Sequence, residues 1–270
     1  MASICVSTES VAGRRGLDAT PSEFAETMAY GSREYRSPAE FLAAHEAAWI
    51  SDLQAVLREL LDPKRSVLSV GSGECEHEVP LVLAGYDIIA SDVVDSAGEA
   101  RRLFPGLRFE IFDALHPRKL GPFDDVLVAG LDFYFDDDAF SRVVGNLRSQ
   151  LRASGRLIFT LRYRNNAATW AIDTLGIPAT CLALGVAGRI GLTRKRYVMK
   201  QHGYRRSIAE IIRVVSRHGF TVGRVRHAGF GQELTRVHLQ RLAPPVFAAL
   251  RAADRRLRVF NNAVVFEFLA

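Results

Sequence analysis

Short apolar runs alternate with amphipathic segments between residues 66 and 162, and this alternation limits the fold more than any other feature of the chain. Three of the segments between the runs have helical character: 76–85, 96–104 and 136–151. Five runs have the length and composition of buried strands: SVLSV (66–70), YDIIASD (86–92), LRFEIFD (107–113), FDDVLVAG (123–130) and SGRLIFTLR (154–162). Such alternation predicts βαβ units in a parallel sheet, where ligands bind at the carboxyl ends of the strands.

The flanking segments extend this core. SPAE (37–40) is a capping box that predicts one long helix continuing to Leu61, and TPSE (20–23) predicts another helix before it. Beyond residue 162 the sequence predicts a helix (207–219), a strand (220–229) and a final strand (259–270). We therefore expect an N-terminal tail and helical extension (1–62), a core (63–162), an inserted lid (163–206) and a C-terminal part of the core with a helical insertion before its last strand (207–270).

Composition narrows the class of protein. The 270 residues are 48% hydrophobic and 24% charged with a net charge of +5, which is ordinary for a globular chain and allows anionic partners. The three cysteines, Cys5, Cys75 and Cys181, lie too far apart for a zinc-ligand motif, so we expect no metal and a reducing, cytoplasmic location. The longest apolar run, 174–188, is shorter than a membrane span and contains Pro178.

The turn after the first strand, in SVLSVGSGECEHE (66–78), indicates the class of ligand. Dinucleotide sites place pyrophosphate on a G-x-G-x-x-G turn, and here the third glycine is replaced by Glu76. Three glutamates in the turn would repel pyrophosphate, each by several kcal/mol at about 4 Å and an effective dielectric near 20. An acidic turn instead favours S-adenosylmethionine (SAM), which carries a sulfonium and an ammonium. The alternative is that Glu76 and Glu78 only complement a helix dipole.

These motifs together resemble the class I (Rossmann-like) SAM-dependent methyltransferases over residues 64–162, the helix at 207 and the last two strands. The resemblance implies an α/β fold with a mainly parallel seven-stranded sheet, helices on both faces and a helical insertion after strand five. Two departures stand in the first motif: Ser69 replaces the usual acid of the first strand, and Cys75 the usual third glycine.

The same resemblance implies a cofactor site. Gly71 and Gly73 would approach the methionine part of SAM, Asp92 would hold the ribose hydroxyls, Asp113 would accept from the adenine amino group and the Ala114 N–H would face the ring. The full expected set is Gly71, Ser72, Gly73, Glu74, Asp92, Val93, Asp113, Ala114 and Gly130. Of the glutamates, Glu74 is the one we expect to touch the cofactor.

Methyl transfer to a hydroxyl often needs a base near the ends of strands four and five. The candidates are Asp132, Tyr134 and His202, and the expected acceptor contacts are Arg162, Tyr163 and Tyr204. Asp132 is equally compatible with capping a turn. His45 and His238 are expected on helical faces with structural roles.

The insertion should determine the acceptor. Its first half is apolar and its second half basic, up to Arg206, so it is either a lid with a solvated basic face or a pocket for an anionic amphiphile, with membrane contact through 174–206 allowed. We expect O-methylation of a small-molecule, sugar or lipid-linked hydroxyl, because no NPPY-type motif is present. An RNA-modifying enzyme, disfavoured by the scarcity of interleaved aromatic residues, and a non-catalytic SAM- or nucleotide-binding module are the alternatives.

Overall fold

A computed structural model describes residues 34–46, 48–162, 175, 206–230 and 261–270. These residues contain one seven-stranded sheet with the order β3-β2-β1-β4-β5-β7-β6. Its strands are β1 (Ser66–Val70), β2 (Asp87–Asp92), β3 (Arg108–Ile111), β4 (Phe123–Ala129), β5 (Leu151–Arg162), β6 (Thr221–Phe230) and β7 (Asn261–Leu269). The sheet confirms the predicted α/β fold and each predicted strand.

The direction of the strands changes at one side of the sheet. Strands β1 to β5 pair in parallel, whereas β7 lies antiparallel between β5 and β6. The chain order reverses at β1, which lies between β2 and β4. Open α/β sheets bind ligands in the crevice outside the carboxyl ends of the strands at such a reversal, which here lies at the ends of β1 and β4.

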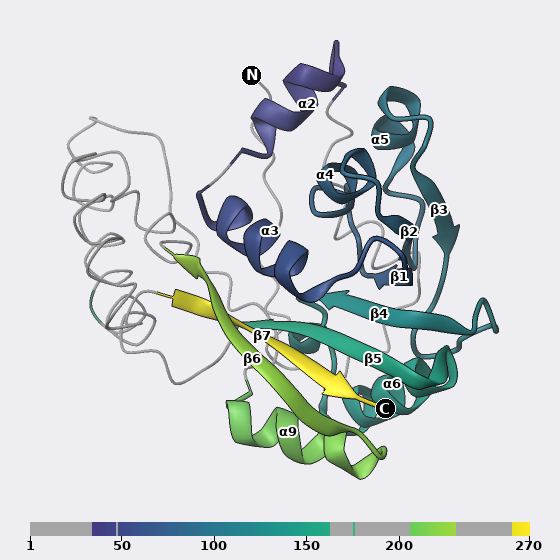
Figure 1. Cartoon of the computed structure of the whole chain (residues 1–270), viewed down its shortest axis with the longest axis vertical. Helices are drawn as coiled ribbons and strands as arrows, with labels where there is room; N and C mark the ends of the chain where they lie inside the picture. Colours follow the sequence, from purple (N-terminus) through teal and green to yellow (C-terminus); the bar gives the residue numbers. More distant parts are fainter. Residues whose placement is uncertain (1–33, 47, 163–174, 176–205, 231–260) are drawn as a thin grey trace, which may run out of the picture.

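Helices cover both faces of the sheet, as Figure 1 shows. Their bounds are α2 (Pro38–Ala44), α3 (Ala48–Leu60), α4 (Glu78–Leu83), α5 (Gly98–Leu103), the short 3-10 helix η2 (Asp132–Tyr134), α6 (Asp137–Ser149) and α9 (Ile208–Arg217). On one face α6 and α9 pack against alternate side chains of the central strands, with Phe140 and Phe159 in edge-to-face contact. On the other face α3 and α4 pack on Val67, Ile88 and Leu127. Within the described residues, no helix is long and apolar enough to span a membrane.

The long helix predicted from Pro38 to Leu61 is wrong, because the structure divides it into α2 and α3. Its start is as predicted: the Ser37 hydroxyl accepts a hydrogen bond from the Glu40 N–H, and Pro38 lies in the first turn. The break comes at His45, whose ring Nδ1 lies 2.8 Å from the Phe41 carbonyl and whose Nε2 lies 3.1 Å from Glu74. His45 therefore ends α2 and turns toward the loop after β1, instead of lying on the face of a continuous helix.

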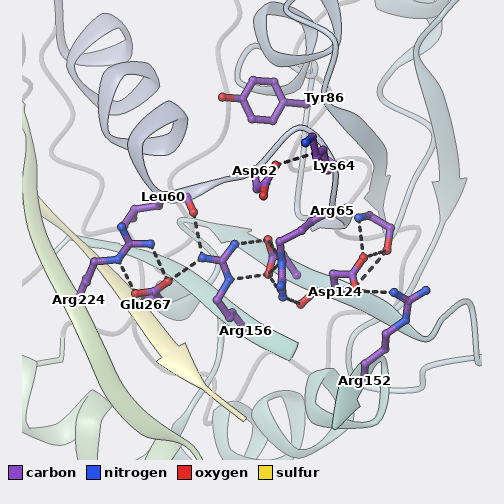
Figure 2. A network of polar contacts seen from close by, with 12 residues as sticks. Leu60, Asp62, Lys64, Arg65, Tyr86, Asp124, Arg152, Arg156, Arg224 and Glu267 are labelled. Atoms are coloured by element: carbon purple, nitrogen blue, oxygen red, sulfur yellow. Dashed lines mark hydrogen bonds and ion pairs between the residues drawn. The ribbon is translucent and has the colours of Figure 1, made fainter. Parts of the chain in front are cut away.

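A network of charged side chains holds the edge of the sheet where the parallel strands begin (Figure 2). The buried Asp125 of β4 accepts from Arg65 and from Arg156, whose Nη2 lies 2.6 Å from Asp125. Arg156 also contacts Glu267 of β7 at 2.7 Å, and Glu267 in turn pairs with Arg224 of β6 at 2.7 Å. Both arginines lower the pKa of Glu267 to about 2. The network joins β4, β5, β7 and β6 at the edge opposite the crevice.

The helix predicted to begin at 20–23, the insertion at 163–205 apart from residue 175, and the helical insertion predicted before the last strand lie outside the described residues. The domain boundaries at 62, 162 and 206 stay predictions.

Candidate functional site

The parallel register places the expected cofactor residues at one edge. Val70, the last residue of β1, pairs with Ser91 on one side and Val128 on the other, and Asp92 pairs with Ile111. The segments that follow β1, β2, β3 and β4 therefore emerge side by side. These segments contain eight of the nine residues expected to hold SAM, and Asp92 ends β2 itself.

The loop after β1 depends on left-handed backbone. Gly71 has φ +78° and Gly73 has φ +51°, a region that residues with a Cβ rarely adopt. A Cβ on Gly71 would also lie 2.5 Å from the Leu131 side chain, whereas no described atom lies within 4 Å of a Cβ placed on Gly73. Gly71 is thus required for packing under the segment after β4, and Gly73 borders open space where a ligand can approach.

Cys75 takes the same left-handed conformation, with φ +65°, although it is not glycine. Its side chain is fully buried beside Val79 and Ala97. Burial raises the pKa of the thiol, so the sulfur stays protonated. The position that departs from the expected third glycine therefore keeps the backbone geometry a glycine would provide.

Asp92 is held directly beside the glycine turn. The Gly73 N–H donates to its Oδ2 at 2.9 Å and the Val93 N–H to its Oδ1 at 2.7 Å. Burial raises the pKa of Asp92, and these backbone donors partly offset that effect. The Ser96 hydroxyl donates to the Gly73 carbonyl at 2.6 Å, so the loops after β1 and β2 are tied together around this carboxylate.

Glu74 is engaged by the N-terminal segment. Its Oε2 accepts from the Tyr35 hydroxyl at 3.4 Å and lies 3.1 Å from His45 Nε2. The hydrogen bond to Glu74 is the main cause of a raised pKa at His45, which favours the imidazolium. The segment is anchored on α5, because the Tyr35 N–H donates to Glu99 at 3.2 Å and Arg102 donates to the Tyr35 carbonyl. The N-terminal extension therefore forms part of the wall beside the glycine turn.

Glu78 is fully buried as the first residue of α4. The Ser69 hydroxyl donates to its Oε1 at 2.6 Å, and its Oε2 is buried without a hydrogen-bond partner among the described residues. Burial raises the pKa of Glu78 to about 7, against the opposing effect of the Ser69 and Ser72 hydroxyls. A role limited to complementing the dipole of α4 does not explain a carboxyl group buried against β1.

Hydroxyl groups link this carboxyl to the cofactor loop. The Ser91 carbonyl accepts from the N–H groups of Gly71 and Ser72 at 2.9 and 3.0 Å. The Ser91 hydroxyl donates to the Ser69 carbonyl at 2.7 Å, and the Ser72 hydroxyl accepts from the Ser91 N–H at 3.2 Å. The ends of β1 and β2, the glycine turn and the start of α4 thus form one polar unit.

Asp113 follows β3 and shapes its own turn. Its Oδ1 accepts from the Leu115 N–H at 2.8 Å, and its Oδ2 lies 3.0 Å from His116 Nδ1. Ala114 is buried, and its carbonyl accepts from Asn146 of α6 at 2.8 Å. The turn after β3 is therefore fixed at the same edge as Asp92.

The segment after β4 carries two of the predicted catalytic residues. Gly130 turns with φ +69°, Asp132 is buried at the start of η2 and Tyr134 is half-buried. Arg206 holds this segment, because it donates to the carbonyls of Asp132 and Phe135 at 2.6 and 2.8 Å. The guanidinium also lies 4.6 Å from the centre of the Phe140 ring. Arg206 is buried, so its assignment to a solvated basic face is wrong, while the alternative of an anion pocket stays a prediction.

The remaining predicted catalytic and acceptor-contact residues lie at the end of β5 or outside the described residues. Arg162 ends β5 at the expected edge. Tyr163, Tyr204, His202 and the 174–206 segment lie outside the described residues, apart from Leu175 and Arg206. Among the described residues, no group of three or more His, Cys, Asp or Glu side chains could hold a metal ion.

Four residues that hold the loops of the candidate site were not among the site residues predicted from the sequence: Tyr35, His45, Glu78 and Arg206. Three of them act across more than 25 residues of sequence, as the separations of 39, 29 and 74 residues from their partners show. Glu78 was visible as an acid in the turn, and its partner Ser69 as the missing acid of the strand. The missing acid in the strand and the extra acid in the following turn could together have predicted the contact between Ser69 and Glu78.

No protein-family model and no curated protein matches the chain significantly. Solved structures do resemble it. The magnesium protoporphyrin IX methyltransferase of Synechocystis, with bound S-adenosylhomocysteine (SAH), has a TM-score of 0.52 at 17% identity over 94% of this chain and 95% of its own. The 1,6-didemethyltoxoflavin-N1-methyltransferase of Burkholderia thailandensis, with its acceptor and SAH, has a TM-score of 0.54 at 16% identity over 93% and 90%. A SAM-dependent methyltransferase of Thermotoga maritima has a TM-score of 0.53 at 18% identity over 86% and 93%. The chain therefore has the fold of the class I SAM-dependent methyltransferases.

Proposed function

We propose that this protein is a SAM-dependent methyltransferase that acts on a small molecule. One contact carries the proposal: the Asp92 carboxylate at the end of β2 lies against the Gly73 N–H at 2.9 Å, at the reversal point of the sheet. A carboxylate suits two vicinal ribose hydroxyls because it can accept both hydrogen bonds. The open space beside Gly73 leaves room for the ligand to approach the loop.

The electrostatics of this edge fit a cationic cofactor better than a dinucleotide. Residues 71–80 contain three glutamates and no lysine or arginine. Glu74 lies at the surface of the turn and Glu78 below it. Pyrophosphate would meet these carboxylates, whereas the ammonium and sulfonium of SAM would be attracted to them. The residues present therefore fit SAM, and they would hold it through Gly71, Ser72, Gly73 and Glu74, with Val93 beside the ribose-binding Asp92.

At the other end of the crevice, the turn after β3 would hold the adenine. Asp113 and Ala114 are placed at the same edge as Asp92 by the pairing of β2 with β3. Asn146 and the Asp113–His116 contact keep this turn in place, so little order remains to be imposed when the ring binds.

The bound cofactor supplies an electrophilic methyl group, and the chain must align an acceptor with it. We place the acceptor beside Gly130 and η2, where the Asp132 carboxylate would receive the proton of the acceptor and Tyr134 would orient the acceptor. Arg162, Tyr163, Tyr204 and His202 stay proposed contributors from the insertion side. We favour a hydroxyl acceptor on a small molecule, sugar or lipid-linked compound, with peripheral membrane contact through 174–206 and a cytoplasmic location as further proposals. The small acceptors named for the structural neighbours support this class.

The experiment is a calorimetric titration of the protein with SAM, SAH and NAD. We expect SAM and SAH to bind and NAD not to bind. Asp92→Ala should weaken SAM at least about tenfold, because hydrogen bonds to a charged group contribute roughly 1.5–3 kcal/mol. Asp95→Ala is the matched control, since Asp95 is an exposed acid on the same loop that pairs with Arg101. Binding of NAD without SAM, or equal SAM affinity in both variants, would refute the proposal.

A further inference from the structure

We propose that Glu78, at the start of α4, provides the buried negative charge that the cofactor loop presents to the cationic part of SAM, with Ser69 fixing its carboxylate. The inference rests on the proposed function and assigns a positioning residue to the same site. It gives a reason for the serine that stands in β1 where the family resemblance implies an acid. The acid is present in space and is delivered from α4 instead of β1.

The geometry supports this assignment in two ways. The Ser69 hydroxyl and Glu78 Oε1 lie 2.6 Å apart, so the carboxyl group is next to the β1 position that lacks an acid. Ser69 and Glu78 are both fully buried, and Ser72 of the glycine turn also acts on the carboxyl group. Glu78 is therefore coupled to the turn that would contact the methionine part of SAM.

The second oxygen of Glu78 is the feature that points to a ligand. A buried polar atom without a partner is costly and needs an explanation. Among the titratable groups nearby in the described part of the chain, Glu76 disfavours ionisation of Glu78, the buried thiol of Cys75 stays neutral, and burial lowers the pKa of the adjacent His77. No lysine or arginine among residues 66–83 neutralises the group. A cation bound above the turn would stabilise the ionised carboxylate of Glu78 through the low dielectric of the loop.

The test compares SAM with SAH, because they differ by the methyl group and the positive charge on sulfur. Affinities are measured at pH 8 for the wild type, Glu78→Gln and the control Glu76→Gln, whose side chain is part-exposed. In Glu78→Gln we expect the preference for SAM over SAH to fall roughly tenfold through loss of one charge. Glu76→Gln should change it about twofold or less, as expected for a screened charge.

A relocation variant separates charge from packing. Ser69→Asp combined with Glu78→Ser returns the carboxylate to β1, and it should restore most of the SAM preference lost in Glu78→Gln. Equal weakening of SAM and SAH in Glu78→Gln would show a purely structural role and overturn the inference. If the wild type binds neither ligand, the proposed function fails instead.

The wild type provides a measurement that does not depend on a variant's folding. Because Glu78 should ionise as the pH rises through about 7, the preference for SAM over SAH should increase between pH 6 and pH 8. His45 and Glu74 also face this turn, so His45→Gln is measured in parallel and should retain the increase. A preference that is independent of pH in the wild type would contradict the inference.

Discussion

At the scale of single residues, the ionised Glu78 carboxylate should destabilise the folded state while it favours the binding of SAM. Burial raises the pKa of Glu78 to about 7 from the ordinary value of 4.5, so the folded state holds a proton that the unfolded state has released between these values. Stability from this group is therefore greatest below pH 4.5 and falls as the pH rises through 7.

Replacing Glu78 with Gln should abolish that fall. Gln keeps an oxygen for the Ser69 hydroxyl and cannot ionise. Relative to the wild type, the free energy of unfolding of Glu78→Gln should rise by about 3 kcal/mol between pH 4.5 and pH 8. Denaturant titrations at several pH values measure it. A difference that is the same at every pH would show that the carboxyl group is not held in a desolvated site.

Cys75 tests the left-handed backbone of the turn. In ordinary helix or strand interiors, glycine is less stable than alanine by roughly 0.5–1 kcal/mol. At φ +65° the order should reverse, because a Cβ there costs about 1–2 kcal/mol. We expect Cys75→Gly to unfold with a free energy about 1 kcal/mol higher than Cys75→Ala, since both lack the thiol. Ala100→Gly in α5 is the reference, and it should be destabilising. An alanine variant as stable as the glycine variant would contradict the geometry.

Residue-scale prediction from sequence succeeded where the signal is local. Gly71, Gly73 and Asp92 lie within one strand–turn–helix–strand unit, and the structure brings them together. Their roles toward SAM stay predictions. The Glu78–Ser69 contact depends on how α4 packs against β1, and the contacts of Tyr35 and His45 depend on where α2 ends. The pattern of apolar residues predicts neither how α4 packs against β1 nor where α2 ends.

At the scale of elements, Arg206 should control the order of the segment after β4. The Arg206 guanidinium donates hydrogen bonds to two carbonyls and to Asp137 at once, a geometry that lysine cannot reproduce. In Arg206→Lys, we expect amide hydrogen exchange in 131–137 to accelerate roughly tenfold or more through loss of one to two hydrogen bonds, and exchange in 86–92 to stay unchanged. Arg213→Ala, an exposed change on α9, is the control. Unchanged exchange in 131–137 would mean that Arg206 does not hold the loop.

Elements were predictable when their own pattern was strong. The capping box of α9 is complete, with the Ser207 hydroxyl accepting from the Glu210 N–H and the Glu210 carboxylate accepting from the Ser207 N–H. The long helix at 38–61 was wrongly predicted because helical spacing continues through the break at His45. A side chain bonded to Glu74, 29 residues away, ends α2, and periodicity contains no information about such a contact.

At the scale of the whole molecule, the charge network around Glu267 should set the response to acid. Arg224 and Arg156 lower the pKa of Glu267 to about 2 from 4.5, so its contribution is present above pH 4.5 and is lost as the pH falls toward 2. The shift corresponds to about 3 kcal/mol. Glu267→Gln should remove that part of the acid-induced loss, as urea titrations between pH 2 and pH 6 would show.

Glu110→Gln is the control for a surface pair, because Glu110 contacts Arg118 with both side chains exposed. It should change stability by less than about 1 kcal/mol. An identical acid response in the wild type and Glu267→Gln would remove the network as a source of stability. The antiparallel position of β7, which brings Glu267 to Arg156, follows from the sheet topology and not from the period of the strands.

The most direct test of the account is the structure of the protein bound to SAH. We expect both ribose hydroxyls to lie within hydrogen-bond distance of Asp92, the adenine to lie beside Asp113 and Ala114, and the homocysteine part to cross the loop from Gly71 to Glu74. Binding of SAH at another edge of the sheet, or a bound ribose that makes no hydrogen bond with Asp92, would contradict the central claim.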